Sequence, residues 1–416
     1  MIKGIFVIID GLGDLPNRQL EDKTPLEVAN TKNMDFLATR GELGYMYPVK
    51  PMFIPESNEA LISIFGNNFT SSTRGRLEAD GEDVKMTHGD LALRANFACI
   101  DHLKSGNILD RRAGRTLSWS EIEDLSDVLN QIELPCKFEF IPTSQHRALL
   151  ILRGGFSDNV SGNDSSYQQG KFKELNKVSK CMAKDDDENS QYTVNILNEF
   201  LEKAYNVLDK HFVNSDRRRR GLMPANFLLV RGAGVEKPKL KQYRSWFSVT
   251  YDPLSKGFSK FSGMRNFSFA YPRLKNIDSY KLFYKGLAKA CKLAIKTIKR
   301  NSKKAEYVYV HLKETDIPGH DNKPLEKKLM LEYIDKTLMK FLRKFAPYNN
   351  VKVVVTGDHS TPCKLKNHSA DPVPVLFYNN SIPKEKYFSE KDCRINGTLG
   401  RILGPELFEK TFYRKN

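Results

Sequence analysis

The chain has few cysteines and no long apolar run, and these two features argue against several classes of protein. Its 416 residues include six cysteines, which are scattered and form no CxxC pair. This pattern argues against a disulfide-bonded secreted scaffold and indicates a reduced, cytoplasmic protein. No stretch approaches the length of a transmembrane helix, and GIFVII near the start is too short for the apolar part of a signal peptide. We therefore expect no membrane partner and interpret GIFVII as a buried strand.

Positive charge is abundant, with a formal net charge of +16. Such a balance could indicate nucleic-acid binding. The lysines are, however, spread through segments such as KACKLAIKTIKRNSKK, whose apolar residues recur at helical spacing. The one tight cluster, Arg217 to Arg220, has no nucleic-acid motif and no interleaved aromatic residues. We expect no nucleic-acid partner and a surface that favours small anionic substrates.

Acidic residues and histidines follow three apolar, β-branched runs. Each such residue alone has a simpler interpretation as a helix cap, a turn residue or a surface histidine. Together they lie at the carboxyl ends of predicted strands, where open α/β sheets place their chemistry. Carboxylates and imidazoles without a thiolate suit ions such as manganese, zinc or magnesium. Cys363 is a conceivable further ligand, but a small buried residue is the commoner role. The candidate ligands are Asp10 after GIFVII, Asp316 and His320 after VYVHL, Asp358 and His359 after VKVVVT, and His368.

Strand and helix patterns alternate at both ends of the chain, which predicts an α/β fold with a mostly parallel sheet flanked by helices. The candidate ligands come only from residues 1–74 and 275–416. The middle, residues 75–274, supplies a second set of strands that end in arginine-rich turns such as ILDRRAGR. We therefore predict a discontinuous metal-binding domain with an inserted second α/β domain that binds substrate.

Several motifs together resemble a known family over nearly the whole length. They run from IDGLGDLP and KTPLEVANTKNMDFLATRG through HGDLALRANFACID, ILDRRAGR and RRRRGLMPANFLLVRGAG. They continue through HLKETDIPGHD to TGDHSTPCKLKNHSADPVPVLFY, which is the most specific. The chain resembles the archaeal type of cofactor-independent phosphoglycerate mutase, in the alkaline phosphatase superfamily.

The resemblance implies two divalent metal ions, with manganese preferred and zinc, magnesium or cobalt as alternatives, and no 2,3-bisphosphoglycerate. Asp10, Ser57, Asp358 and His359 would hold the first ion, and Asp316, His320 and His368 the second. Ser57, in IPESNEALISIFG, matches the family's nucleophile. A helix cap is the simpler interpretation of this serine, and both roles are compatible, since a helix N-terminus favours negative charge.

The resemblance also implies which insert residues bind a small phosphorylated carboxylate. Arg111 and Arg115, in DRRAGR, match the family's substrate arginines, and guanidinium groups bind such anions bidentately. By the same resemblance, Arg231 in FLLVRGAG would be a further substrate contact, and Lys256 in DPLSKG would be both a substrate contact and a catalytic residue. For any single arginine, a surface or interdomain salt bridge is the alternative. The sequence does not fix the oligomeric state.

Three segments depart from the family pattern. Glu56 to Leu61 replace Gly-Ser-Asp-Thr-Ala-His, GRLEADG shortens a GRGPFEALG-like stretch, and the stretch from Ser268 to Lys275 replaces a PGATG-like segment. The leading hypothesis is a mutase that interconverts 3- and 2-phosphoglycerate in glycolysis and gluconeogenesis. The departures keep a second hypothesis open, another metal phosphatase or phosphotransferase of the same superfamily. A third, a non-catalytic basic binding protein, is disfavoured by the complete ligand set.

Overall fold

The computed structural model describes residues 1–68, 74–164, 167–168, 171–172, 176–274 and 277–414. The strands are β1 (Gly4–Ile9), β2 (Gly41–Tyr47), β3 (Leu91–Ile100), β4 (Ile108–Asp110), β5 (Phe138–Ser144), β6 (Arg147–Leu152), β7 (Tyr167–Gln168), β8 (Lys171–Phe172), β9 (Phe227–Gly234), β10 (Trp246–Val249), β11 (Arg265–Phe267), β12 (Tyr307–Leu312), β13 (Lys352–Thr356), β14 (Val373–Tyr378) and β15 (Gly400–Leu403). The α-helices are α1 (Pro25–Val28), α2 (Lys32–Thr39), α3 (Ser57–Ile64), α4 (Arg74–Gly81), α5 (Trp119–Leu129), α6 (Glu188–Lys210), α7 (Phe212–Arg219), α8 (Pro253–Phe261), α9 (Ser279–Asn301), α10 (Asp316–His320), α11 (Pro324–Ile334), α12 (Lys340–Asn349), α13 (Glu390–Ile395) and α14 (Leu407–Lys410).

The larger sheet has the order β11-β10-β12-β1-β13-β14-β2-β15. Its pairings are parallel except for the two made by β14, which runs antiparallel to both β13 and β2. The predicted class, an α/β fold with a mostly parallel sheet, is confirmed. The central strands β12, β1 and β13 are the three that precede the predicted ligands.

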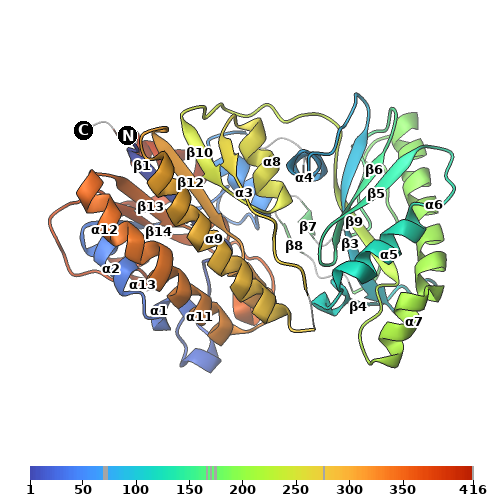
Figure 1. Cartoon of the computed structure of the whole chain (residues 1–416), viewed down its shortest axis with the longest axis horizontal. Coiled ribbons are helices and arrows are strands. Elements are labelled where there is room, and N and C mark those ends of the chain that lie inside the picture. Colours follow the sequence, from blue (N-terminus) through green and yellow to red (C-terminus); the bar gives the residue numbers. More distant parts are fainter. Residues whose placement is uncertain (69–73, 165–166, 169–170, 173–175, 275–276, 415–416) are drawn as a thin grey trace.

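Helices cover both faces of this sheet, which explains why its central strands are continuous apolar runs. Side chains alternate between the faces along each strand. Val7 and its neighbours on one face pack against α2, α9, α11 and α12. Phe6 and Tyr309 on the other face pack against α3, α8 and α14. In Figure 1 the larger sheet, with α2, α9, α11 and α12, forms the left-hand body of the molecule.

The smaller sheet lies on the right in Figure 1, with α5, α6 and α7 beside it. It joins β4, β3, β6 and β5 in that order, and β9 also pairs with β3; all of these pairings are antiparallel. One face of β3, including Phe97, packs against α5 and α6. The alternate residues Arg94 and Asn96 point from the opposite face and line a cavity between the two bodies.

Helices α4 and α8 lie between the two bodies (Figure 1). They approach so closely that a Cβ atom on Gly257 would stand 1.8 Å from the carbonyl oxygen of Leu77, and one on Gly81 1.8 Å from that of Pro253. Strands β10 and β11, which precede and follow α8, belong to the larger sheet. We therefore propose that the inserted unit ends before β10, earlier than the boundary at residue 274 that the sequence suggested.

No helix in the described part of the chain is long and apolar enough to cross a membrane.

Candidate active site at the carboxyl edge of the large sheet

The predicted ligands from both ends of the chain meet at one edge of the larger sheet. Asp10 directly follows β1, Asp316 begins α10 after β12, and Asp358 and His359 follow β13. His368 precedes β14, whose antiparallel direction brings its start to the same edge. The parallel order β12-β1-β13 thus gathers residues that are more than 300 positions apart in sequence.

The first group surrounds Asp10. His359 Nε2 lies 3.3 Å from Asp10 Oδ1 and 3.5 Å from Asp358 Oδ2. Ser57 Oγ lies 3.2 Å from the same His359 nitrogen. Ser57 is the first residue of α3, where backbone N–H groups and the helix dipole favour an anion. All four residues are buried.

The second group surrounds Asp316. His320 Nε2 lies 3.3 Å from Asp316 Oδ2, and His368 Nε2 lies 3.8 Å from Asp316 Oδ1. The rings of His359 and His368 stack with their centroids 3.7 Å apart, so the two groups are adjacent. Thr361 connects them, because its hydroxyl donates to Asp316 Oδ1 at 2.7 Å and lies 3.0 Å from His359 Nδ1.

The hydrogen bonds at Nδ1 of three histidines direct Nε2 toward the carboxylates. His320 Nδ1 lies 2.9 Å from the Lys366 carbonyl, and His368 Nδ1 lies 2.8 Å from the Pro55 carbonyl. A carbonyl only accepts, so each Nδ1 carries the proton. Thr361 donates its one proton to Asp316, so His359 Nδ1 donates to Thr361 in turn. Metal-ligating histidines hold their other ring nitrogen in this way.

The charges of the site also fit bound cations. Asp10 Oδ1 and Asp358 Oδ2 are buried without a hydrogen-bond partner among the described residues, and Asp10 Oδ2 forms an ion pair with the Lys313 ammonium. Burial by itself would raise the pKa of Asp358, but the neighbouring His359, Lys313 and His311 lower it to about 2. Burial lowers the pKa values of His320 and His368, which favours neutral imidazoles. Ionised carboxylates with neutral imidazoles are the protonation states that divalent metals require.

A cavity of about 740 Å³ opens over these groups, between the two bodies. Its walls include the predicted metal-site residues Asp10, Ser57, Asp316, His320 and His368. The insert contributes the predicted substrate residues Arg111, Arg115 and Arg231 to the opposite wall, and α8 contributes Lys256 to the lining. The tertiary structure therefore brings the two predicted sets of residues to one cavity.

Each predicted substrate residue has an acidic partner. Arg111 Nη1 donates to Asp164 Oδ1 at 2.6 Å, and Lys256 Nζ to Glu82 Oε1 at 2.9 Å. Two further pairs connect the insert with the large-sheet body: Arg115 Nη2 lies 3.5 Å from Asp321 Oδ1, and Arg231 Nη1 lies 2.7 Å from Glu56 Oε1. These ion pairs hold the four cationic side chains in place without a bound substrate.

Glu56, at one of the departures from the family pattern, stands beside the candidate nucleophile. Besides Arg231 it contacts Arg74, whose Nη1 lies 3.3 Å from Glu56 Oε2. Burial alone would raise the pKa of Glu56, but Arg231 and Arg74 lower it to about 2. The N-cap position of α3 thus carries a negative charge next to Ser57 at neutral pH.

The departure at Ser268 to Lys275 forms another part of the wall, and its last residue lies outside the described residues. Tyr271 and Tyr251 donate hydrogen bonds to Glu314 at 3.0 and 2.6 Å. Burial raises the pKa of Glu314 to about 7. This segment therefore fixes a buried carboxyl group two residues before Asp316.

Sequence reasoning missed several residues of the site, above all His311 and Lys313. His311 Nε2 lies 3.3 Å from Asp10 Oδ2, and the Lys313 ammonium forms an ion pair with the same oxygen. The strand pattern contained a usable signal. Tyr309, His311 and Lys313 alternate on one side of β12, and His311 pairs in register with Ile8, two residues before Asp10.

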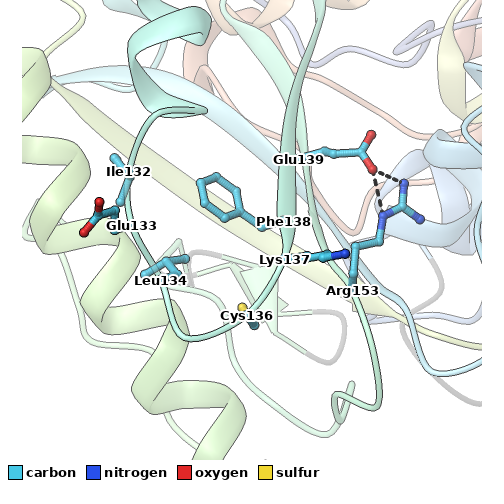
Figure 2. A pocket seen from close by; sticks show the side chains of 8 residues that line it. All are labelled: Ile132, Glu133, Leu134, Cys136, Lys137, Phe138, Glu139 and Arg153. Carbon is cyan, nitrogen blue, oxygen red and sulfur yellow. Dashed lines mark hydrogen bonds and ion pairs between the residues drawn. The ribbon is translucent and has the colours of Figure 1, made fainter.

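A second hollow, of about 780 Å³, lies at the outer edge of the smaller sheet and lacks such chemistry (Figure 2). Glu139 and Arg153 pair with each other on its wall at 2.5 Å. Burial raises the pKa of its one thiol, Cys136, which makes a reactive thiolate unfavourable. The cavity between the two bodies is therefore the candidate active site.

Comparison with curated proteins finds relatives along nearly the whole chain. A family profile described as 2,3-bisphosphoglycerate-independent phosphoglycerate mutase matches residues 38–214. A protein of that name from Thermococcus kodakarensis is 37% identical over 97% of this chain and 95% of its own length. A protein of the same name from Pyrococcus furiosus is also 37% identical, over 97% of this chain and 95% of its own length.

Solved structures are also similar to this chain over nearly its whole length. A protein from Pyrococcus horikoshii matches with a TM-score of 0.73 and 29% identity, over 100% of this chain and 98% of its own. The cofactor-independent phosphoglycerate mutase from Thermoplasma acidophilum matches with a TM-score of 0.53 and 26% identity, over 99% of both chains. The similarity therefore extends over both bodies of the chain.

Proposed function

The chain belongs to the family of 2,3-bisphosphoglycerate-independent phosphoglycerate mutases, and from this premise we propose that it interconverts 3-phosphoglycerate and 2-phosphoglycerate. The reaction is an isomerisation in glycolysis and gluconeogenesis that needs no bisphosphorylated cofactor. The observation that carries the proposal is the position of Ser57, between the Asp/His groups and a cavity lined by arginines. The preference for manganese and the cytoplasmic location stay predictions.

Ser57 is the proposed nucleophile. Its Oγ would accept the phosphoryl group from one hydroxyl of phosphoglycerate, which leaves a phosphoserine and free glycerate. The other glycerate hydroxyl would then take the group back. Asp10, Ser57, Asp358 and His359 would hold one metal ion, and Asp316, His320 and His368 a second. When bound, such ions supply positive charge that lowers the pKa of a serine hydroxyl and stabilises the phosphoryl oxygens.

The arginines of the opposite wall are proposed to hold glycerate while it reorients. Arg111 and Arg115 come from the insert, and their guanidinium groups suit a carboxylate or phosphate. Arg115 is buried, which together with nearby Arg112 lowers its pKa to about 10, so it stays charged at neutral pH. Lys256 is proposed as a further cation for the phosphoryl group. Enclosure between two bodies would also limit the entry of water, whose attack would convert transfer into hydrolysis.

A coupled assay tests the proposal directly. The purified chain with manganese, 3-phosphoglycerate and excess enolase should form phosphoenolpyruvate, with little phosphate released in parallel. Absence of phosphoenolpyruvate from protein with confirmed bound metal would refute the mutase proposal.

The charge on Glu56 favours a second candidate, a phosphatase or phosphotransferase with a different small phosphate ester. A carboxylate paired with Arg231 and Arg74 competes with an anionic substrate for both arginines. Fast phosphate release from phosphoglycerate without phosphoenolpyruvate would support this candidate. A Glu56→Gln variant, which keeps the size of the side chain, would show whether the charge sets the ratio of transfer to hydrolysis.

A further inference from the structure

His311 belongs to neither ligand group predicted from the sequence, yet it is fully buried directly beneath the first one. It lies near the end of β12, between β10 and β1. The register of the strands places His311 beside Ile8, and Ile8 beside Thr356. Ile8 lies two residues before Asp10, and Thr356 two residues before Asp358. His311 is therefore on the same face of the sheet as these two candidate ligands. The imidazole therefore points along the face from which both carboxylates project.

Among the described residues, hydrogen bonds hold the ring of His311 at Nδ1 and not at Nε2. Its Nδ1 lies 2.7 Å from the Tyr309 hydroxyl and 3.1 Å from Ser255 Oγ. Its Nε2 is buried and has no hydrogen-bond partner within the described residues. The three predicted histidine ligands show the same arrangement, with Nδ1 bonded to the protein and Nε2 directed at the carboxylates.

The distances from Nε2 to the two carboxylates are longer than a hydrogen bond and close to those between atoms that bind one ion. His311 Nε2 lies 3.3 Å from Asp10 Oδ2 and 3.7 Å from Asp358 Oδ2, whereas N–H···O bonds measure about 2.7–3.2 Å. Donor atoms about 2.0–2.2 Å from one ion in tetrahedral directions lie roughly 3.3–3.6 Å apart. His359 Nε2 keeps 3.3 and 3.5 Å from the same two carboxylates.

We propose that His311 is a ligand of the metal ion held by Asp10 and Asp358, so that two imidazoles and two carboxylates bind it beside Ser57. This inference rests on the metal site of the proposed function and adds one protein ligand to it. A neutral imidazole ligand at the base of the site would fix the ion's position without adding charge. Lys313, which pairs with Asp10 in this structure, would then be released toward the cavity that it also lines.

The test counts nitrogen ligands of bound manganese by pulsed EPR in the full-length protein. The parent carries His320→Gln and His368→Gln, which remove the imidazoles of the second group. With less than one equivalent of manganese, we expect two directly coordinated imidazole nitrogens in this parent. We expect one after the further change His311→Gln. A single coordinated nitrogen in the parent would overturn the proposal and leave His311 as a positioning residue for the carboxylates.

Manganese affinity gives a second readout in the same His320→Gln, His368→Gln parent, in which the first ligand group is intact. There His311→Gln should raise the Kd of manganese by at least about tenfold, while His146→Gln, at a buried histidine of the insert, should not. An unchanged Kd in a folded His311→Gln protein would contradict the proposal. The coupled assay separates the mutase proposal from the assignment of His311 as a ligand. Mutase activity in the wild-type chain, with one coordinated nitrogen in the parent, would refute only the ligand assignment. Two coordinated nitrogens without mutase activity would refute only the proposed function.

Discussion

At the scale of single residues, the site depends on a few polar atoms that the surrounding core keeps from water. Ser57, Asp10 and Asp358 are buried, and a polar atom of each lies within 3.5 Å of His359 Nε2. Replacing such an atom removes a function that neighbouring residues cannot supply. Conservative changes at this scale therefore separate chemistry from folding.

Ser57→Ala should abolish phosphoryl transfer and leave the fold and at least one bound metal ion. The variant loses only the hydroxyl at the start of α3, while Asp316, His320 and His368 remain. Mutase turnover measures transfer, circular dichroism measures the fold, and metal analysis measures the bound ions. Ser63→Ala, at another buried serine of the same helix, is the matched control and should stay active. Turnover above a tenth of wild type in Ser57→Ala would exclude the covalent route.

Arg111→Ala and Arg115→Ala should each lose about 2–5 kcal/mol of transition-state binding for phosphoglycerate, as truncation of a buried charged contact does. Hydrolysis of p-nitrophenyl phosphate, which has no carboxylate to hold, should fall much less, and metal content should not change. Values of kcat/KM for both substrates measure the difference. Equal losses on both substrates would assign the two arginines to structure, through their pairs with Asp164 and Asp321.

At the scale of elements, close helix packing sets the position of the cavity wall. Helices α4 and α8 carry Arg74 and Lys256, and Gly257 permits their contact. Gly257→Ala should lower the free energy of unfolding by about 1–3 kcal/mol, because the added methyl group has no space beside the Leu77 carbonyl. Denaturation in urea measures the change. Lys260→Ala, at a partly exposed site on the same helix, should change it by less than about 0.5 kcal/mol.

Glu390, the first residue of α13, should make the free energy of unfolding depend on pH. Burial raises the pKa of Glu390 from 4.5 to about 7, although its carboxylate accepts a bond from Thr24. Between these values the folded chain binds more protons than the unfolded chain, so Glu390 makes stability fall as pH rises. Glu390→Gln should remove about 2–3 kcal/mol of this decline between pH 4.5 and 7. Urea titrations at several pH values test it, with exposed Glu385→Gln as control; parallel curves would contradict it.

At the scale of the whole molecule, the two ends of the chain and the insert must come together around the metal ions. Chelation should abolish transfer and lower the Tm, because Asp10, Asp316 and Asp358 would then repel one another. Metal at about 100 times its Kd should stabilise the fold by about 2.7 kcal/mol. Thermal melts with chelator and after return of manganese measure this. Full activity after verified metal removal would exclude a metal-dependent mechanism.

The sequence by itself determined the parallel sheet and the positions of the ligands along the chain. Continuous β-branched runs such as VKVVVT form strands buried on both faces, and the polar residue after each run must lie at the strand's carboxyl end. The resemblance added Ser57, which no local pattern distinguishes from a helix cap. These features depend on short segments, so they can be recognised one segment at a time.

Only the tertiary structure decided which residues meet. Strand order places β12 beside β1, and this pairing brings His311 and Lys313 to Asp10 across about 300 residues of sequence. The same holds for Glu56, which reaches Arg231 of the insert, and for β10 and β11, which pair in the large sheet although the sequence assigned them to the insert. Pairing between distant segments depends on packing of the whole chain, and a periodic pattern in one segment carries no information about its partner.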